Sequence, residues 1–256
     1  LQSPAGVSAS SNGFLAKTAR FVGKAAHAGV APEQGINAMN AATLALTAIN
    51  AQRETFRDQD CVRVHPILTK AGDIVNIVPA EVKMETYVRA RTTAAMLDAA
   101  AKVDRALKGA AIASGCTVEV ETVPGYLPLN NDAKLADMFR ATVEQLFGAD
   151  AYHELPHSGG ATDAGDLSQM MPVLHPHMTG ARGIVHGKDW HIADRDDGYI
   201  APAKTLAMMA VELLADDAAK AREVLAGFQP AMSKQEYLEQ QQDIFRTDVY
   251  DGAGLA

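Results

Sequence analysis

An alternation between strand-like and helix-like periodicity along the first half of the chain constrains the fold most. Residues 14–23 (FLAKTARFVG), 82–90 (VKMETYVRA) and 117–123 (TVEVETV) alternate apolar and polar side chains. A period of two predicts strands that bury one face. Residues 36–56, and a longer Ala-rich segment that ends at Gly115, instead repeat apolar residues at helical spacing.

A further β-branched run, CVRVHPILTKAG at residues 61–72, separates the first helical segment from the second alternating strand. The order is therefore β-α-β-β-α-β, which predicts a ferredoxin-like unit with both helices on one face of an antiparallel sheet. Thr92 or Thr93 is the expected N-cap of the second helix. The residues expected to face the core are Ile36, Met39, Leu44, Ala48 and Ile49 in the first helix, and Leu97, Ala101, Val103, Leu107 and Ala111 in the second.

The pattern changes after Gly125. Helices are predicted over residues 133–147 and 203–214, the second opened by Pro202. Residues 152–198 between them are rich in Gly and Asp and hold six of the eight histidines, and loops this long are usually functional. A polar amphipathic helix with one turn is predicted from residue 216 to residue 250. The core face expected for the 203–214 helix is Leu206, Met209, Ala210, Leu213 and Leu214.

Composition excludes several classes of partner. The net charge of −8, with no Lys/Arg cluster, argues against binding to nucleic acid or to an anionic membrane. No apolar run approaches the roughly 18 to 20 residues that span a bilayer, and no signal peptide is visible. Cys61 and Cys116 fit neither a metal motif nor a disulfide framework, so a cytoplasmic location is expected. Because the sequence starts at Leu1 rather than Met, a fragment or a processed product is expected.

Two short motifs in the ferredoxin-like half are candidate binding or catalytic sites. His27 stands among small residues in RFVGKAAHAG, residues 20–29. It is either a strand-end histidine with a satisfied hydrogen bond or a catalytic group with room for a ligand. Asn76 opens NIVPAE, residues 76–81, where turn chemistry is the better explanation of the motif taken alone.

The second half offers two more candidates. Paired glycines precede Thr162 and Asp163 in GGATDAGDLS, residues 159–168, where the backbone can approach a ligand closely. Asp163 and Asp166 are candidate bases or ligands, although helix capping explains them equally well. The absence of Gly-Lys-Ser/Thr excludes a phosphate-binding loop of the P-loop type.

Residues 175–194, HPHMTGARGIVHGKDWHIAD, contain side chains that zinc prefers. These are His175, His177, His186, His191, Asp189 and Asp194. Their spacing is not that of the helix-borne HExxH motif, so a metal site and an ordinary loop remain open alternatives. No GxSxG elbow is present, which disfavours a serine hydrolase.

Taken together, GKAAHAG, GDIVNIVP, GGATDAGDLS and GIVHGKDW resemble the C-terminal portion of the M20 family. These enzymes are dinuclear-metal peptidases and amidohydrolases, and the likeness is strongest to the aminoacylase and aminobenzoyl-glutamate hydrolase branch. The resemblance runs from about Phe14 to Leu214. Each motif is weak alone, but their order and spacing together are fairly specific.

The resemblance implies an α/β (α+β) fold class. A ferredoxin-like βαββαβ lid domain would occupy residues 13–124 and mediate homodimerisation. Residues 1–12 would be an N-terminal segment of the catalytic domain or a linker. Residues 125–256 would form the C-terminal part of an α/β zinc-peptidase-like catalytic domain, with a helical tail.

The resemblance also assigns roles to individual residues. His27 matches the lid histidine that reaches the substrate carbonyl, commonly in the partner's active site, and His186 matches a C-terminal metal ligand. The residues implied to contact substrate are Asn76, Gly159, Gly160, Thr162 and Asp163. The implied reaction is cleavage of a small N-acyl or aminoacyl amide by water activated between two divalent ions, zinc, manganese or cobalt. His27 would stabilise the developing oxyanion.

The sequence departs from the family in its metal ligands. The family takes most of them from an N-terminal segment with a His-x-Asp motif, a bridging Asp and a Glu-Glu pair, and none of these precedes Phe14. One histidine does not hold two metals. The chain is therefore expected to be incomplete, lacking an N-terminal half, or to be a non-catalytic scaffold or inactive relative.

The sequence does not identify the substrate. Arg89 and Arg91 on a lid strand are candidates for binding a carboxylate, because a guanidinium matches a carboxylate bidentately. They are equally well explained as solvent-facing strand residues. N-carbamoyl, N-acyl and aminoacyl-glutamate amides are all compatible with the motifs.

Overall fold

The computed structural model describes residues 5–255, with side chains through Gly254, and divides them into two compact units. The sheet unit comprises residues 12–128, 159–161 and 234–255. The histidine-rich unit comprises residues 5–11, 129–158 and 162–233. Of the segment predicted over residues 1–12, residues 1–4 lie outside the described residues.

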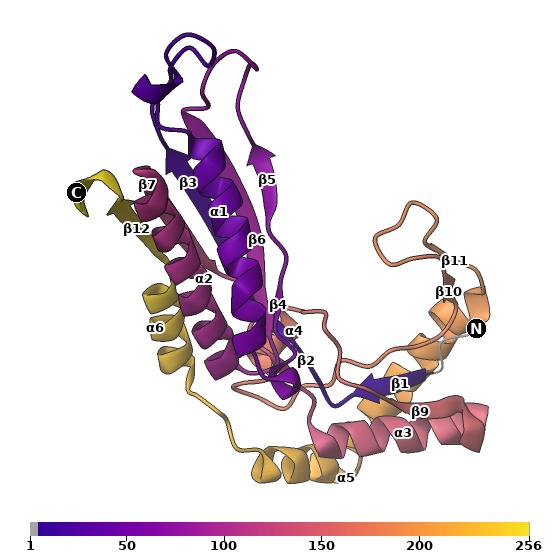
Figure 1. Cartoon of the computed structure of the whole chain (residues 1–256). Helices are drawn as coiled ribbons and strands as arrows, with labels where there is room; N and C mark the ends of the chain where they lie inside the picture. The colour runs from indigo at the N-terminus through magenta and orange to yellow at the C-terminus, as the bar shows by residue number, and fades with distance from the viewer. Residues whose placement is uncertain (1–4, 256) are drawn as a thin grey trace. The chain divides into compact units, whose positions relative to one another are not determined.

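An antiparallel sheet is the centre of the sheet unit (Figure 1). Its strand order is β12-β7-β3-β6-β4, with β5 pairing β6 beside β4. The bounds are β3 Gly13–Val22, β4 Arg63–Val64, β5 Ile67–Lys70, β6 Glu81–Ala90, β7 Thr117–Pro124 and β12 Arg246–Asp251. Burial alternates along β3 and β6, as their sequence period of two predicted. The α/β (α+β) fold class is confirmed.

Two helices, α1 (Ala38–Ala51) and α2 (Thr93–Ser114), run side by side over one face of this sheet (Figure 1). The Asn37 side chain caps α1 by accepting from the amides of Met39 and Asn40. The Thr92 hydroxyl caps α2 by accepting from the Ala95 amide, as predicted. Gly115 ends α2 in the left-handed conformation, with φ +68°.

Parts of the predicted core faces were wrong. Leu44 on α1 and Leu97 and Ala101 on α2 are exposed, whereas Val103, Leu107 and Ala111 are buried as predicted. In α2 the residues facing the sheet also include Ala99 and Ala100. Alanine occurs on several sides of this helix, so the apolar pattern alone does not fix which face turns inward.

A buried ion network joins three elements of the sheet unit. Lys17 on β3 is 2% exposed, and its Nζ lies 2.7 Å from Asp104 Oδ1 on α2 and donates to Thr122 Oγ1 at 2.8 Å. Arg246 on β12 donates to Asp104 Oδ2 at 3.0 Å. Burial lowers the pKa of the Lys17 ammonium below its ordinary value, although the carboxylate of Asp104 opposes that shift.

The C-terminal segment departs from the sequence prediction. Helix α6 (Lys234–Ile244) ends at Ile244, and residues 246–251 form strand β12 rather than continuing a helix to residue 250. Strand β12 pairs antiparallel with β7 from Arg246↔Thr122 to Asp251↔Thr117. Long-range pairing with the β7 edge therefore overrides the local, polar helix-like pattern.

The histidine-rich unit is built around two parallel strands, β1 (Ala5–Ser8) and β9 (Tyr152–Leu155). Helix α3 (Ala133–Phe147) has the predicted bounds, and its N-cap is Asp132, which accepts from the Leu135 amide. Met138, Phe139 and Val143 of α3 pack with Ala5, Val7 and Met209 in one apolar cluster.

Helix α5 (Ala201–Gly227) contains a break in its middle. Residues 215–218 leave the helical conformation, and Asp216, Asp217 and Ala218 have φ between +48° and +57°. Met209 is buried as predicted, but Leu206 and Leu214, also predicted to face the core, are 59% and 70% exposed. Only one of the two apolar faces of α5 is thus covered by the described residues.

The remaining elements are short. The strands are β2 (Ser10–Ser11) with β8 (Leu129–Asn130), and β10 (Ala181–Arg182) with β11 (His191–Ile192). The helical turns are α4 (Ala164–Leu167), the 3-10 turns Pro32–Gln34, Gln52–Thr55, Asp58–Asp60, Ala149–Ala151 and Ala253–Leu255, and a π turn at Asp196–Ile200. Among residues 5–255, no helix combines the length and apolar character needed to cross a membrane.

Candidate functional site

Two loops at one end of the sheet unit bring His27 and Asn76 together. After Gly23, the chain exchanges both backbone hydrogen bonds between Lys24 and Ile36, each 2.9 Å long. His27 then forms a β-bridge with Ile77, and the Ala28 amide donates to the Asn76 carbonyl at 2.9 Å. The motifs GKAAHAG and NIVPAE, about fifty residues apart in sequence, therefore form one backbone-bonded ledge.

The hydrogen bonds of the His27 ring determine which of its nitrogens carries the hydrogen. Nδ1 accepts from the backbone amides of Gly29 and Val30, both at 3.2 Å. In the neutral ring the hydrogen then lies on Nε2, an assignment that follows from the network. The side chain is exposed, so it presents an N–H donor to a ligand. Both interpretations of the histidine are thus compatible: its Nδ1 is satisfied locally, and its Nε2 remains a donor.

Exposed apolar side chains surround this histidine. Ile74, Val75 and Ile77 on one loop and Val30 on the other are all exposed. The Asn76 side chain is also exposed. An N–H donor among uncovered apolar side chains suits a surface that becomes covered by a substrate or by another polypeptide.

The glycine-rich motif crosses from one unit to the other. Gly159 and Gly160 belong to the sheet unit, and Thr162 and Asp163 to the histidine-rich unit. A Cβ added to Gly159 would contact nothing within 4 Å. The Thr162 hydroxyl donates to Asp163 Oδ1 at 3.2 Å and accepts from the Ala164 amide at 3.4 Å. Asp163 is exposed and is the N-cap residue of α4, but its side chain accepts no capping hydrogen bond, so helix capping does not explain its carboxylate.

His186, the predicted metal ligand, lies at the tip of an exposed turn in the histidine-rich unit. The turn is closed by the Gly187 amide donating to the Ile184 carbonyl at 2.6 Å. His186 itself has φ +67°, a left-handed conformation that is uncommon for a residue with a Cβ. Within residues 5–255, no three His, Cys, Asp or Glu side chains are grouped so as to hold a metal ion. The described residues therefore do not by themselves fit a dinuclear metal site.

The other histidines of residues 152–198 have partners of their own. His157 Nδ1 lies 3.0 Å from the Ser10 hydroxyl, and His191 Nδ1 lies 2.8 Å from the Asp189 carbonyl. The rings of His175 and His177 meet edge to face, with centroids 5.8 Å apart. Partial burial, and then the neighbouring His175, lower the pKa of His177. His186 takes part in none of these contacts.

Arg89 on β6 and Arg91 just after this strand make different contacts. The Arg89 guanidinium lies over the rings of Phe14 and Tyr87, 5.3 and 5.4 Å from their centroids. The stacking uses the face of the guanidinium. Its edge, which carries the N–H groups that would bind a carboxylate, is not used by the rings. The Arg91 amide donates to the Asp60 carbonyl at 2.9 Å, which fixes the end of β6.

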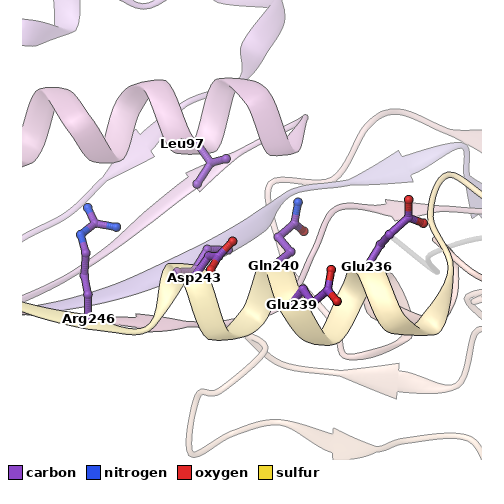
Figure 2. A pocket seen from close by; sticks show the side chains of 7 residues that line it. Leu97, Glu236, Glu239, Gln240, Asp243 and Arg246 are labelled. Carbon is purple, nitrogen blue, oxygen red and sulfur yellow. The ribbon is translucent and has the colours of Figure 1, made fainter.

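A cavity of about 440 Å³ lies elsewhere in the sheet unit, between α2 and α6 (Figure 2). Leu97 projects from α2 toward α6, which carries the carboxylates of Glu236, Glu239 and Asp243 (Figure 2). Arg246 also lines it, but that side chain is bonded to Asp104 and Asp248. None of the predicted site residues lines this cavity. The sequence did not indicate it because the acidic face of α6 looks like an ordinary solvated helix.

Comparison with known proteins identifies the family of the sheet unit. Residues 10–115 match the peptidase dimerisation domain of the M20 type. This segment runs from before β3 to the end of α2, and it includes the ledge that carries His27 and Asn76.

Curated relatives extend the match beyond that domain. The Xaa-Arg dipeptidase of Mus musculus is 29% identical over 206 residues, which are 77% of this chain and 47% of the relative. One of the subunits of the p-aminobenzoyl-glutamate hydrolase of Escherichia coli (strain K12) is 28% identical over 217 residues, 83% of this chain and 48% of the relative. The chain thus spans about half the length of these curated relatives.

Solved structures agree on the fold. An aminopeptidase from Bacillus cereus superposes with a TM-score of 0.64 at 20% identity, covering 83% of this chain and 55% of the other. The family that the four motifs predicted is confirmed. Residues 10–115 are a dimerisation domain of the M20 peptidases, and the chain is a homologue of an Xaa-Arg dipeptidase and of a p-aminobenzoyl-glutamate hydrolase subunit.

Proposed function

We propose that this chain is part of an M20 amidohydrolase that cleaves an amide bond of a small N-acyl or aminoacyl substrate. The sheet unit would be the lid and dimerisation domain, and the histidine-rich unit would be part of the catalytic domain. The observation that carries the proposal is the His27 ledge within the matched dimerisation domain. The names of the relatives, a dipeptidase and an aminobenzoyl-glutamate hydrolase, support the reaction class.

His27 is the proposed electrophilic group. When a nucleophile adds to an amide carbonyl, negative charge develops on the carbonyl oxygen and needs a positioned donor. The Nε2–H of His27 supplies that donor, because the Gly29 and Val30 amides already occupy Nδ1. The ring therefore needs no change of tautomer to bind the oxyanion.

The other family-matched residues have proposed roles in binding. Asn76 shares the ledge with His27, and its amide side chain is proposed to hydrogen-bond the substrate. Gly159 and Gly160 would let the backbone approach the substrate closely, and Thr162 and Asp163 are also proposed to contact substrate. Recognition of a substrate carboxylate by the stacked Arg89 guanidinium is compatible with an aminoacyl-glutamate amide.

The proposal includes a metal requirement. Two divalent ions, zinc, manganese or cobalt, would supply an activated water, and His186 would be one ligand. Because no metal-binding group occurs within the described residues, we propose that the other ligands come from an N-terminal half that this sequence does not contain. A cytoplasmic location stays a prediction from the cysteine content.

Helix α5 supports the proposed additional half. The outward residues Ala203, Leu206, Ala207, Ala210, Val211 and Leu214 form an exposed apolar stripe along one side of the helix. The opposite side of α5 packs through Met209 into the apolar cluster with α3. A helix that is apolar on two opposite sides is typically packed against other protein on both of those sides. The missing half is the proposed cover of this stripe.

Amide hydrolysis by the full-length gene product that carries these residues tests the proposal. The substrates would be N-acyl, N-carbamoyl and aminoacyl-glutamate amides, assayed with zinc, manganese or cobalt. His27→Ala is expected to lower kcat about 100- to 1,000-fold, because one oxyanion donor is lost. His27→Gln, which keeps an N–H donor, is expected to show a smaller loss. His65→Ala, which removes the other, exposed histidine of the sheet unit, is the matched control; equal losses for His27→Ala and His65→Ala would contradict the assigned role.

The second candidate is a non-catalytic dimerisation scaffold. The absence of a metal-binding group among the described residues favours it. A scaffold predicts that the full-length product hydrolyses none of these amides and binds no stoichiometric divalent metal, although it still self-associates. Metal analysis together with the hydrolysis assay separates the two candidates.

A further inference from the structure

The C-terminal segment, residues 228–252, connects the two units a further time. The chain leaves the histidine-rich unit after Ser233 and enters the sheet unit at Lys234, the first residue of α6. Helix α6 lies against β7, and β12 then pairs with β7 (Figure 1). This segment, which we call the strap, lies outside residues 10–115 that match the dimerisation domain.

The strap is firmly held at its sheet-unit end. Six residue pairs join β12 to β7, and just beyond β12 the Gly252 amide donates to the Cys116 carbonyl at 2.9 Å. A Cβ on Gly252 would lie 2.2 Å from the Ala111 carbonyl oxygen, so the backbone comes this close only at a glycine. The Lys108 ammonium lies 3.8 Å from the centre of the Tyr250 ring, a cation–π contact. Backbone and side-chain contacts together therefore fix this end.

The other end of the strap is bonded to Gln169 in the histidine-rich unit. The Ala231 and Met232 amides both donate to the Gln169 carbonyl, at 2.8 and 3.3 Å. Because α6 begins at Lys234, a single residue, Ser233, separates this contact from the helix. One residue spans at most about 3.3–3.6 Å. The connection between the Gln169 contact and α6 therefore has little slack.

Gln169 also holds the turn that carries Thr162 and Asp163. It is 6% exposed, and its Nε2 donates to the Gly165 carbonyl at 3.0 Å. The Ser168 hydroxyl donates to the same carbonyl at 2.7 Å. The Gly165 amide in turn donates to the Thr162 carbonyl at 3.0 Å. A series of hydrogen bonds therefore runs from the strap through Gln169 to this turn.

We propose that the strap couples the sheet unit to the turn that carries Thr162 and Asp163. While β12 is paired with β7, the strap keeps its two amides on the Gln169 carbonyl and so holds the turn in place. Two attachments on a short connection reinforce each other, because each one raises the effective concentration of the other. The consequence for catalysis rests on the proposed amidohydrolase function, in which the lid and the turn both contact substrate. The coupling itself is measurable without a substrate.

Hydrogen–deuterium exchange of the full chain tests the coupling. Gly252→Ala loosens the sheet-unit end of the strap, because the added Cβ overlaps a backbone oxygen. Gly254→Ala is the matched control, since the nearest atom to a Cβ there is a side-chain oxygen at 3.4 Å. Gly252→Ala is expected to speed exchange of the two amides that donate to Gln169 at least about 5-fold, and Gly254→Ala less than about 2-fold. Truncation after Phe245, which removes β12 altogether, is a second variant with the same expected result as Gly252→Ala.

A longer connection separates transmission along the strap from general damage. Gly/Ser residues, about twelve of them, inserted after Ser233 keep both attachments but give the strap slack. In a chain with this insertion, Gly252→Ala and the truncation are expected to change exchange of the two amides less than about 2-fold. Faster exchange that persists with the insertion, or no faster exchange in either variant without it, would overturn the coupling.

The same insertion measures what the strap contributes to catalysis in the full-length gene product. It is expected to lower kcat about 10-fold, because the turn is held less precisely. An unchanged kcat in an active enzyme would overturn the catalytic part of the proposal. A wild-type product that hydrolyses no amide would instead refute the proposed function, and the exchange experiment would still decide whether the strap couples the two units.

Discussion

Gly23 shows how a single residue determines the shape of the His27 ledge. A Cβ at this position would lie 2.1 Å from the Ile36 carbonyl oxygen, which is a backbone atom and has little freedom to move. Gly23→Ala is expected to cost about 1–3 kcal/mol of unfolding free energy, because the two backbone segments must separate. Chemical denaturation measures the loss.

Gly109 in α2 is the matched control for this substitution. A Cβ there would meet nothing within 4 Å, and the residue is exposed within a helix. Gly109→Ala should therefore stabilise the protein by about 0.5–1 kcal/mol through helix propensity. Equal effects of the two substitutions would mean that the approach of Gly23 to Ile36 is not a real constraint.

The residues of the candidate site also show which of its features could be predicted from the sequence. The family resemblance implied that His27 and Asn76 both act near the substrate, and their loops share backbone hydrogen bonds. Local periodicity contains no information about that contact, because it arises from pairing between two loops about fifty residues apart. The tautomer of His27 could not be predicted either, since it depends on the fold of Gly29 and Val30 around Nδ1.

At the scale of elements, the Lys17–Asp104 pair ties β3 to α2 inside the core. Asp104→Ala would leave the 2% exposed Lys17 without its carboxylate. That loss is expected to cost about 3–5 kcal/mol, because an unpaired charge remains buried. Denaturant unfolding of the variant measures this cost.

Two further variants show whether the charge or the volume matters in this network. The double variant Lys17→Met/Asp104→Leu should recover most of the lost stability, since apolar residues of similar size replace the whole pair. Arg246→Ala should cost less than about 1 kcal/mol, because the Arg246 side chain is 43% exposed. If the double variant is no more stable than Asp104→Ala, packing rather than the buried charge controls this site.

The elements themselves followed local rules to different degrees. The bounds of α3 were predicted because Asp132 supplies a cap and the helix ends before Gly148. The core face of α2 was mispredicted at Leu97 and Ala101, since alanine offers nearly equal burial on several faces. Strand β12 was mispredicted as helix, because its partner β7 lies more than 120 residues earlier in the chain. A pattern read over a short stretch of sequence contains no information about a pairing partner so far away in the chain.

At the scale of the whole molecule, the exposed stripe of α5 bears on whether this chain is a complete folding unit. Leu206→Lys/Leu214→Lys is expected to change the unfolding free energy of the 256-residue chain by no more than about 0.5 kcal/mol, because both side chains are exposed. The same change should reduce binding of a hydrophobic dye and slow aggregation. Dye fluorescence and light scattering are the measurements.

Leu238→Lys on α6 provides the control for this experiment, because Leu238 is exposed but stands among polar residues. It should leave dye binding nearly unchanged. A loss of more than about 2 kcal/mol in the α5 variant would mean that these leucines are buried in solution by residues already present, which contradicts an uncovered stripe.

Strand β12 gives the sheet unit a particular order of assembly. Its first strand, β3, begins at residue 13, but its last, β12, ends at residue 251. The entire histidine-rich segment from residue 162 to residue 233 is translated between β7 and the strand that pairs with it. During synthesis, the β7 edge therefore stays without this partner until residues 246–251 have been made. A pause in translation before those residues would leave a nascent chain with an open strand edge, the kind of surface that chaperones and neighbouring nascent chains bind.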